Sequence, residues 1–430
     1  MPTYNPGGGY DYSDTKLWGY SLTHVSGPGC GAAGDVPMVP MTGPLPATGV
    51  DPNTITTSFS HTGEVAQAGY SSAQSNQPDT VTSEFTATPH SSMARFTYPA
   101  TNQADFVIKL MASQNGDNGD GAQVVGDNEV EGSDTSGGFC GESNHDGQPQ
   151  LYTVHFDIVF DHPFTASKVV TNANQTDPAA VELTFETSKD QVIQAKVGIS
   201  YVSADNAKLD WQTENPGWNF NSVRRHAQRT WDRLLGRIQV SGGSYAQTQE
   251  FYSLLYKDFI QPNVTSDVNG QFMGSDLKVH GVAPGQQNQY GMYSGWDIYH
   301  SLAQLQAMLD PHPAGDMVQS QINYYSEDKL LQQWGYDNLN NYVMVGDPED
   351  SILTDYYTFG AHNFNTKDAL ADMLAQATTS TTCGPARRSS SRTDTCPRTA
   401  RTAAATHTGS CRRCSSTTAR TWRWRSSPPT

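Results

Sequence analysis

The chain contains no apolar run of the roughly 18 residues that a membrane-spanning helix requires. Charged residues are also few, at 16%, and only 26 are basic against 43 acidic. An acidic surface is repelled by the phosphates of nucleic acids and by anionic lipid headgroups. The sequence therefore argues against nucleic acid as a partner and against insertion into a membrane.

The chain opens without the features of a signal peptide, since Met1–Pro6 has neither a basic region nor an apolar one. We therefore expect either a cytoplasmic protein or a native N-terminus that lies upstream. Cysteine is scarce too: only Cys30 and Cys140 precede residue 380, and four others follow it. A disulfide between these two and a pair of buried thiols are both consistent with the sequence.

Hydrophobic residues alternate with a period of two from about residue 80 to 205, after a turn-rich stretch up to about residue 70. The alternation predicts strands at 81–88, 94–98, 105–110, 151–160, 181–185 and 192–202. Short strands between turn signals are typical of an antiparallel β-sandwich. Asn115–Asp127 partly resembles a calcium loop. However, Gly116 stands at the first ligand position and has no side chain, so we predict a solvated hairpin loop.

The period becomes helical near residue 217, first in a stripe that predicts a helical linker. Ser244 and Gln247 then form a predicted capping box at the start of the next helix. Later helices are expected from Leu302 and at about 316–334, 348–360 and 366–377. Helices that follow a sandwich indicate an α+β multidomain chain in which a helical toroid packs on a β domain.

The composition changes after residue 378. From residue 381 on there are ten arginines, no lysine and a single acid, Asp394. Such a segment cannot bury a core. It is either a disordered basic arm or the product of a reading-frame shift in a GC-rich gene. We prefer the frame shift, because Ser415–Ser427, back-translated with GC-rich codons and shifted, gives an apolar-periodic helix.

The segment Gly291–His300 places an aromatic residue and a carboxylate, Trp296 and Asp297, at the start of a helical pattern. An aromatic ring can cover the apolar face of a sugar while a carboxylate accepts from its hydroxyls. A core tryptophan beside a helix-capping aspartate would give the same pattern. His24 lies on a strand-like segment that runs into a glycine-rich loop. It too could be either a functional residue or a structural histidine with its hydrogen bonds satisfied.

The chain resembles glycoside hydrolase family 92, the α-mannosidases, over about residues 5–377. The resemblance rests on Gly19–Gly27, Phe59–His61, Glu64, Gly69–Tyr70, Lys196–Ser203, Gln261–Asn263, Ser266–Gly270, Trp296–Asp297, Gly346–Asp347 and Asp355. It implies a β-sandwich followed by an (α/α)6 toroid, in a secreted or periplasmic enzyme that hydrolyses α-mannosides with inversion and uses Ca²⁺. It also implies a sugar-binding wall formed by His24, Trp296, Asp297 and Asp347.

The family's acid lies in an Asn-Glu-Pro motif and its base in a Gly-Asn-Asp-Asp segment, and neither occurs in this sequence. We therefore predict that the catalytic residues and the Ca²⁺ ligands lie downstream of this chain. The chain would be an inactive fragment of an exo-α-mannosidase of the α-1,2 type that acts on mannose-containing glycans. A non-catalytic glycan-binding fragment and another sandwich-plus-toroid carbohydrate-active enzyme are the alternatives.

The domain boundaries follow from these patterns and from the resemblance. They are a β-sandwich at 1–215, a helical linker at 216–243, the first part of an (α/α)6 catalytic domain at 244–378, and a disordered Arg/Ser/Thr-rich tail at 379–430.

Overall fold

The computed structural model describes residues 10–25, 29–76, 79–139, 150–172, 177–340 and 346–378. Predictions for Met1–Pro6, Cys140 and the tail at 379–430 lie outside these residues. Within them, no helix has both the length and the apolar character needed to cross a bilayer.

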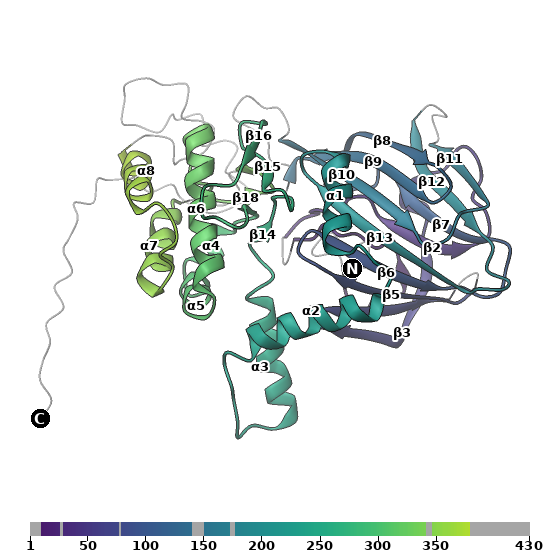
Figure 1. Cartoon of the computed structure of the whole chain (residues 1–430), viewed down its shortest axis with the longest axis horizontal. Coiled ribbons are helices and arrows are strands. Elements are labelled where there is room, and N and C mark those ends of the chain that lie inside the picture. Colours follow the sequence, from purple (N-terminus) through teal and green to yellow (C-terminus); the bar gives the residue numbers. More distant parts are fainter. Residues whose placement is uncertain are drawn as a thin grey trace, which may run out of the picture. The chain divides into compact units, whose positions relative to one another are not determined.

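The first part of the chain forms two antiparallel sheets (Figure 1). The larger sheet has nine strands in the order β1 (Lys16–Leu17), β3 (Thr57–Gln67), β4 (Tyr70–Ser75), β5 (Val81–Ala87), β6 (Ser91–Thr97), β13 (Val192–Ser200), β10 (Leu151–Phe160), β9 (Glu129–Gly137) and β8 (Asp117–Val125). The smaller sheet has four strands in the order β11 (Ala166–Thr171), β12 (Pro178–Phe185), β7 (Ala104–Lys109) and β2 (Met38–Thr42). A short 3-10 helix, Pro52–Thr54, precedes β3.

Aromatic side chains from the two sheets meet in one buried core. Phe96 of β6 packs at 5.2 Å on Phe106 of β7, which in turn lies 5.1 Å from Phe160 of β10. Side chains alternate between the two faces of a strand, so every second residue can reach this core. The predicted antiparallel sandwich is confirmed.

The strands predicted between residues 81 and 202 are present as β5, β6, β7, β10, β12 and β13. The turn-rich stretch up to residue 70 also contains two strands that were not predicted from the sequence, β2 and the long β3. One prediction for this region is wrong. Asn115–Asp127 is not a solvated loop, because β8 pairs with β9 along Asp117–Val125. Polar side chains there hide a strand from a hydrophobicity pattern.

Three helices follow the sandwich: α1 (Ala204–Glu214), α2 (Phe220–Leu235) and α3 (Tyr245–Lys257). Helix α1 lies against β13, where a Cβ on Gly198 would be 1.8 Å from the carbonyl oxygen of Ala207. The sequence does not predict α1, because its buried face includes the polar residues Asn206 and Asp210 rather than an apolar stripe. The predicted capping box of Ser244 at the start of α3 is confirmed.

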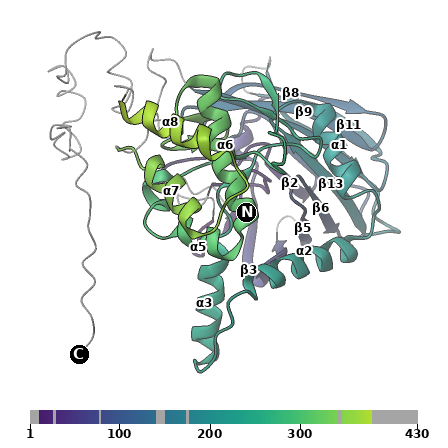
Figure 2. The same ribbon diagram turned by 60° about the vertical axis from the view of Figure 1, so that its left-hand side comes forward.

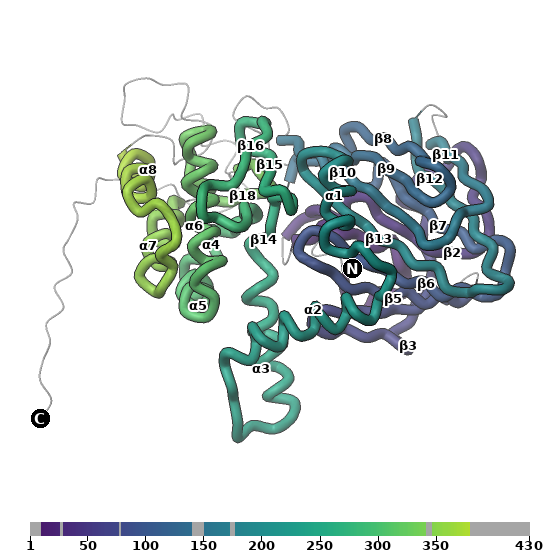
Figure 3. Tube along the Cα trace, in the orientation of Figure 1, coloured from purple at the N-terminus to yellow at the C-terminus, as the bar shows by residue number. Residues whose placement is uncertain are grey.

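In the rest of the described chain, short two-stranded ladders alternate with helices (Figure 3). The ladders are β14 (Asn263–Val264) with β17 (Tyr290–Gly291), β15 (Gln271–Met273) with β16 (Val279–Gly281), and β18 (Gly335–Tyr336) with β19 (Leu339–Asn340). The helices are α4 (Gly295–Ile298), α5 (Leu302–Leu309), α6 (Pro311–Asp328), α7 (Glu349–Phe359) and α8 (Thr366–Thr378).

The predicted bounds of α6, about 316–334, are wrong. The helix begins at Pro311, because proline suits the first turn, where no helical partner awaits its missing N–H. It ends at Asp328, because Lys329 adopts a left-handed conformation with φ of 65°. Helices α5, α6 and α7 share an apolar cluster that includes Tyr293 and Tyr356 (Figure 2).

A separate apolar cluster joins the sandwich to the helical part. Val25 and Ala33 of the sandwich pack there with Met292, Trp334 and Tyr336. The backbone N–H of Ala33 also donates to the Tyr336 hydroxyl at 2.5 Å. Through Met292, this junction holds the beginning of the predicted sugar-binding segment.

Cys30, which packs at the same junction, is disulfide-bonded. Its partner lies outside the described residues, since Cys30 is the only cysteine within them. The alternative of a buried free thiol is therefore wrong for Cys30.

Candidate functional site

Helix α4 begins within the predicted sugar-binding segment, at Gly295. Any residue with a Cβ at this position would require the neighbouring atoms to move. A Cβ on Gly295 would lie 2.4 Å from the carbonyl oxygen of Gln333 and 2.6 Å from Glu349 Oε1. Ser294, just before it, forms a β-bridge with Trp334. The start of α4 is therefore held between the junction and the start of α7.

Trp296 and Asp297 project from this fixed point toward solvent. Trp296 is 49% exposed, and Asp297 is exposed and accepts a hydrogen bond from the Ser294 hydroxyl. His300 lies edge-on to Trp296 at 6.5 Å and contacts Tyr299 at 4.0 Å. An accessible ring beside an accessible carboxylate can stack on a sugar face and accept from its hydroxyls.

Glu349 was not predicted from the sequence, although only Pro348 separates it from the Gly346–Asp347 motif. Its side chain is completely buried, and neither carboxylate oxygen has a hydrogen-bonding partner among the described residues. Burial, followed by the charges of Asp347 and Asp350, raises the pKa of Glu349 well above its usual value. Burial without a partner favours the protonated form of a carboxyl group, and this carboxyl lies against Gly295, the residue before Trp296.

Asp347 lies close to the same place but is directed elsewhere. It accepts a hydrogen bond of 2.8 Å from Gln376 Nε2 of helix α8, and burial raises its pKa. Its influence on the pKa of Glu349 places the two acids within electrostatic range of each other. The structure therefore places Gly295, the residue before Trp296, and Asp347 near one buried acid.

His24 stands apart from this group. It lies in irregular chain rather than in the predicted strand-like segment, and its carbonyl oxygen accepts from Asn263 Nδ2 at 3.3 Å. Burial lowers the pKa of its imidazole to about 4, so the ring is neutral at pH 7. Within the described ranges, no hydrogen bond or ion pair joins its side chain to Trp296, Asp297 or Asp347.

Two more buried acids occupy the junction itself. Asp35 accepts from the Tyr152 hydroxyl at 2.9 Å, and that hydroxyl lies 3.2 Å from the one on Tyr336. Asp337 is 1% exposed, and neither of its oxygens forms a hydrogen bond within the described chain, although the Tyr201 hydroxyl is near. Burial and the charge of Asp35 raise the pKa of Asp337 well above its usual value.

Among the described residues, three groups of side chains could hold a metal ion, and none of them includes the predicted sugar wall. They are Asp276, His280 and Glu327; Asp117, Asp120 and Asp134; and Glu129, Glu131 and Asp157. The described residues around Trp296 thus do not offer three ligand atoms at one point. The Ca²⁺ that the family resemblance implies therefore has no matching donor set among them.

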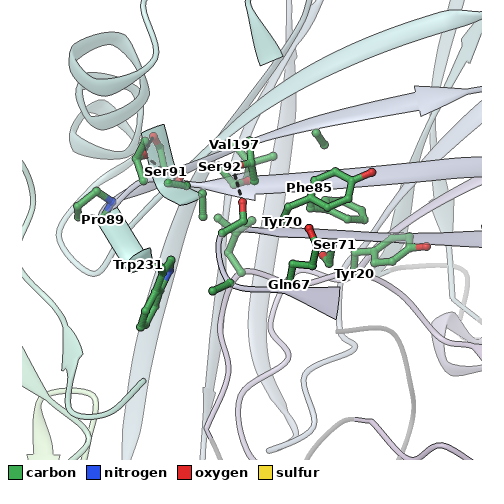
Figure 4. Close-up of a pocket in the computed structure, with 18 of the residues that line it drawn as sticks. Tyr20, Gln67, Tyr70, Ser71, Phe85, Pro89, Ser91, Ser92, Val197 and Trp231 are labelled. Atoms are coloured by element: carbon green, nitrogen blue, oxygen red, sulfur yellow. Dashed lines mark hydrogen bonds between the residues drawn. The ribbon is translucent and has the colours of Figure 1, made fainter. Parts of the chain in front are cut away.

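A cavity of about 1160 Å³ lies elsewhere, between the larger sheet and helices α2 and α3 (Figure 4). Tyr70, Phe85 and Trp231 are among its lining residues, and most of its surface is apolar. None of the four predicted site residues lines it. Asp267 does, but its carboxylate already accepts from Ser200 and Asn206.

Two family models match the sequence. The "Glycosyl hydrolase family 92 N-terminal domain" matches residues 2–200, and the "Glycosyl hydrolase family 92 catalytic domain" matches residues 206–408. A curated relative, an "Uncharacterized secreted glycosidase" from Arthroderma benhamiae, is 32% identical over 74 residues, which are 16% of this chain and 10% of the relative.

Solved structures share the fold. The family GH92 α-mannosidase BT3965 from Bacteroides thetaiotaomicron matches with a TM-score of 0.79 and 23% identity, over 89% of this chain and 53% of its own. The inverting mannosidase BT2199 of the same organism matches with a TM-score of 0.74 and 20% identity, over 88% of this chain and 51% of its own. This chain therefore spans about half the length of these structures.

Both family models fall in order along the sequence, and the fold found here is the fold of solved members. The chain belongs to glycoside hydrolase family 92.

Proposed function

We propose that the protein to which this chain contributes is an exo-α-mannosidase of the α-1,2 type, secreted or periplasmic, that acts on mannose-containing glycans with inversion and requires Ca²⁺. The observation that carries the proposal is the match of both family 92 models across the chain. Further support comes from the neighbours: both are named mannosidases, one is named as inverting, and BT3965 has also been solved with mannoimidazole. The helical part would then be the first portion of an (α/α)6 toroid.

In this proposal the surface around α4 binds the terminal mannose. The Trp296 ring stacks on the sugar, and Asp297 accepts from its hydroxyls. Glu349 packs against Gly295 and so orients the segment, and Asp347 lies within electrostatic range of Glu349. His24 contributes from the sandwich side only if the bound sugar extends to the junction.

We also propose that the 430-residue chain does not hydrolyse mannosides by itself. Inverting hydrolysis needs one acid at the leaving oxygen and one carboxylate that activates water, roughly 6.5–9.5 Å apart. The Asn-Glu-Pro and Gly-Asn-Asp-Asp motifs that the family resemblance assigns to these roles are absent from the sequence.

Glycan binding without hydrolysis is the second candidate function. The half-exposed Trp296 beside an accessible carboxylate favours it, because such a surface needs no catalytic pair to hold a sugar.

One experiment tests both proposals. The purified 430-residue chain is assayed for hydrolysis of 4-nitrophenyl α-mannoside and α-1,2-mannobiose with and without Ca²⁺, and for mannobiose binding by calorimetry. We expect no hydrolysis, measurable binding, and at least tenfold weaker binding in Trp296→Ala. Tyr245→Ala removes an aromatic side chain that is 83% exposed on α3 and serves as the matched control. Calcium-dependent hydrolysis would refute the proposed inactivity, and equal binding by both variants would refute the assigned surface.

A further inference from the structure

Three carboxylates lie together at one end of the β8–β9 hairpin. Asp120 and Asp134 are directly opposite each other across the two strands. Asp117 precedes Asp120 on β8, on the other side of a β-bulge. Ala122 and Val124, further along β8, pack against the sandwich core. Since alternate residues share a face, Asp120 points toward the same interior as these apolar side chains.

The three carboxylates converge without a basic partner. One oxygen of each lies within 4.8 Å of the others. Like charges directly opposite each other destabilise a strand pair, and burial increases the cost. Yet none of the ion pairs formed within the described residues involves Asp117, Asp120 or Asp134.

Backbone amides from neighbouring segments orient the three side chains. The N–H of Val36 donates to Asp134 Oδ2 at 3.2 Å, that of Ser113 to Asp117 Oδ1 at 3.0 Å, and that of Met111 to Asp120 Oδ2. Such fixed donors hold each carboxylate in one direction, as the outer partners of metal ligands do.

The carboxylate oxygens that accept no backbone hydrogen bond also point to a ligand. Asp134 has no exposed surface, and its Oδ1 has no hydrogen-bonding partner among the described residues. Asp120 Oδ1 opposite it is also buried and without a partner. Buried polar atoms are almost always satisfied, so these two facing oxygens call either for a bound ligand or for a proton shared between the two carboxyl groups.

We propose that Asp117, Asp120 and Asp134 bind a divalent cation, with Ca²⁺ as the best match. The donors are all oxygens, which hard cations prefer over soft ones. Ca²⁺ tolerates irregular geometry and accepts mixed carboxylate and water ligands, and the partly exposed Asp117 and Asp120 leave an entry for it. This site lies in the sandwich and does not depend on the proposed hydrolase function.

The other two acid clusters differ because a lysine side chain pairs with each of them. In one, Lys208 Nζ pairs with Glu129 at 2.5 Å, and Asp157 accepts from Trp211 Nε1 at 2.6 Å. In the other, Lys278 Nζ pairs with Asp276 at 2.9 Å. A lysine ammonium already supplies positive charge there, so neither cluster requires a metal ion.

The test titrates CaCl₂, and MgCl₂ for comparison, into the chelator-treated 430-residue chain by calorimetry, with thermal unfolding measured in parallel. The variants are Asp134→Asn, which keeps the side-chain shape, and Asp127→Asn, which changes an exposed carboxylate at the turn of the same hairpin. Asp127 is also part of the calcium-loop pattern in the sequence. The Asp127→Asn variant therefore distinguishes a site formed by that continuous loop from a site formed across the two strands.

We expect one Ca²⁺ to bind at the cluster, to raise the Tm, and to bind at least tenfold more weakly in Asp134→Asn but unchanged in Asp127→Asn. Without Ca²⁺, Asp134→Asn should melt no lower than the wild type, because it removes a buried like charge. If Asp134→Asn does not fold, Asp117→Asn at the exposed edge replaces it. Equal Ca²⁺ responses in wild type and cluster variants, or none in the wild type, would mean that a shared proton neutralises the carboxylates and would overturn the proposal.

Discussion

The variant Gly295→Ala tests whether the start of α4 depends on close contact with the start of α7. Propensity alone predicts that alanine in a helix is more stable than glycine by up to about 1 kcal/mol. The structure predicts the opposite sign. The added Cβ would lie 2.4 Å from the Gln333 carbonyl oxygen and 2.6 Å from both Glu349 Oε1 and Pro348 Cγ, where ordinary contacts begin at 3.4 Å.

The neighbours must therefore separate by 3.4 − 2.4 = 1.0 Å at the closest contact. Two of these neighbours are held in place, since the Gln333 carbonyl is backbone and Glu349 is completely buried. Overpacking of this kind typically costs about 1–3 kcal/mol. Subtracting the full helical gain of about 1 kcal/mol leaves an expected net loss of up to about 2 kcal/mol in the free energy of unfolding.

Urea denaturation followed by circular dichroism measures this loss. The matched control is Gly281→Ala, where a Cβ meets no atom within 4 Å and which should cost nothing. If Gly295→Ala is as stable as the wild type with an unchanged m-value, the close contact between Gly295 and Glu349 is wrong.

Three further substitutions follow from the burial of single groups. Lys109 is fully buried and its Nζ has no hydrogen-bonding partner within the described residues; burial lowers its pKa from 10.5 to about 6. The unfolded chain then binds more protons between pH 6 and 10.5, so wild-type stability rises with pH, and Lys109→Met should be the more stable protein in urea at pH 6.5 with a smaller advantage at pH 9. Asp337→Asn should raise the Tm at pH 7.5 but not near pH 4. The pKa of Asp337 is higher in the folded state than in the unfolded chain, so the free energy of unfolding of the wild type falls as the pH rises above the pKa of the unfolded carboxyl group. A gain of equal size at both pH values would contradict this. Gly198→Ala should lower the Tm by several degrees or prevent folding, since its Cβ would lie 1.8 Å from the carbonyl oxygen of Ala207, whereas Gly217→Ala, with nothing within 4 Å, should not.

The sequence of strands followed by helices was predictable because it follows from local periodicity. Alternating residues in β10 and β13 and the capping box at Ser244 each act over a few neighbouring residues. The family resemblance also comes from short motifs, and both family models match. The predicted domain boundaries and site roles are not tested by these findings and stay predictions.

Local patterns failed where polar residues face inward. Helix α1 buries Asn206 and Asp210, and strand β8 carries Asp120 toward the interior, so neither shows the expected apolar period. A polar side chain becomes acceptable inside only when a distant segment supplies its partner, as Val268 N–H does for Asp210 at 2.9 Å. Such a partner is invisible in the sequence around it.

The sequence by itself determined the two-part architecture and the family, because these depend on residues that are neighbours in the chain. Only the tertiary structure decided that Trp296 and Asp297 are exposed and which carboxylates share an environment. Glu349 lies against Gly295, and Asp134 lies opposite Asp120, because chain folding brings them within a few ångströms. Burial and charge act through space rather than along the chain, and they determine which of these acids can stay ionised without a partner.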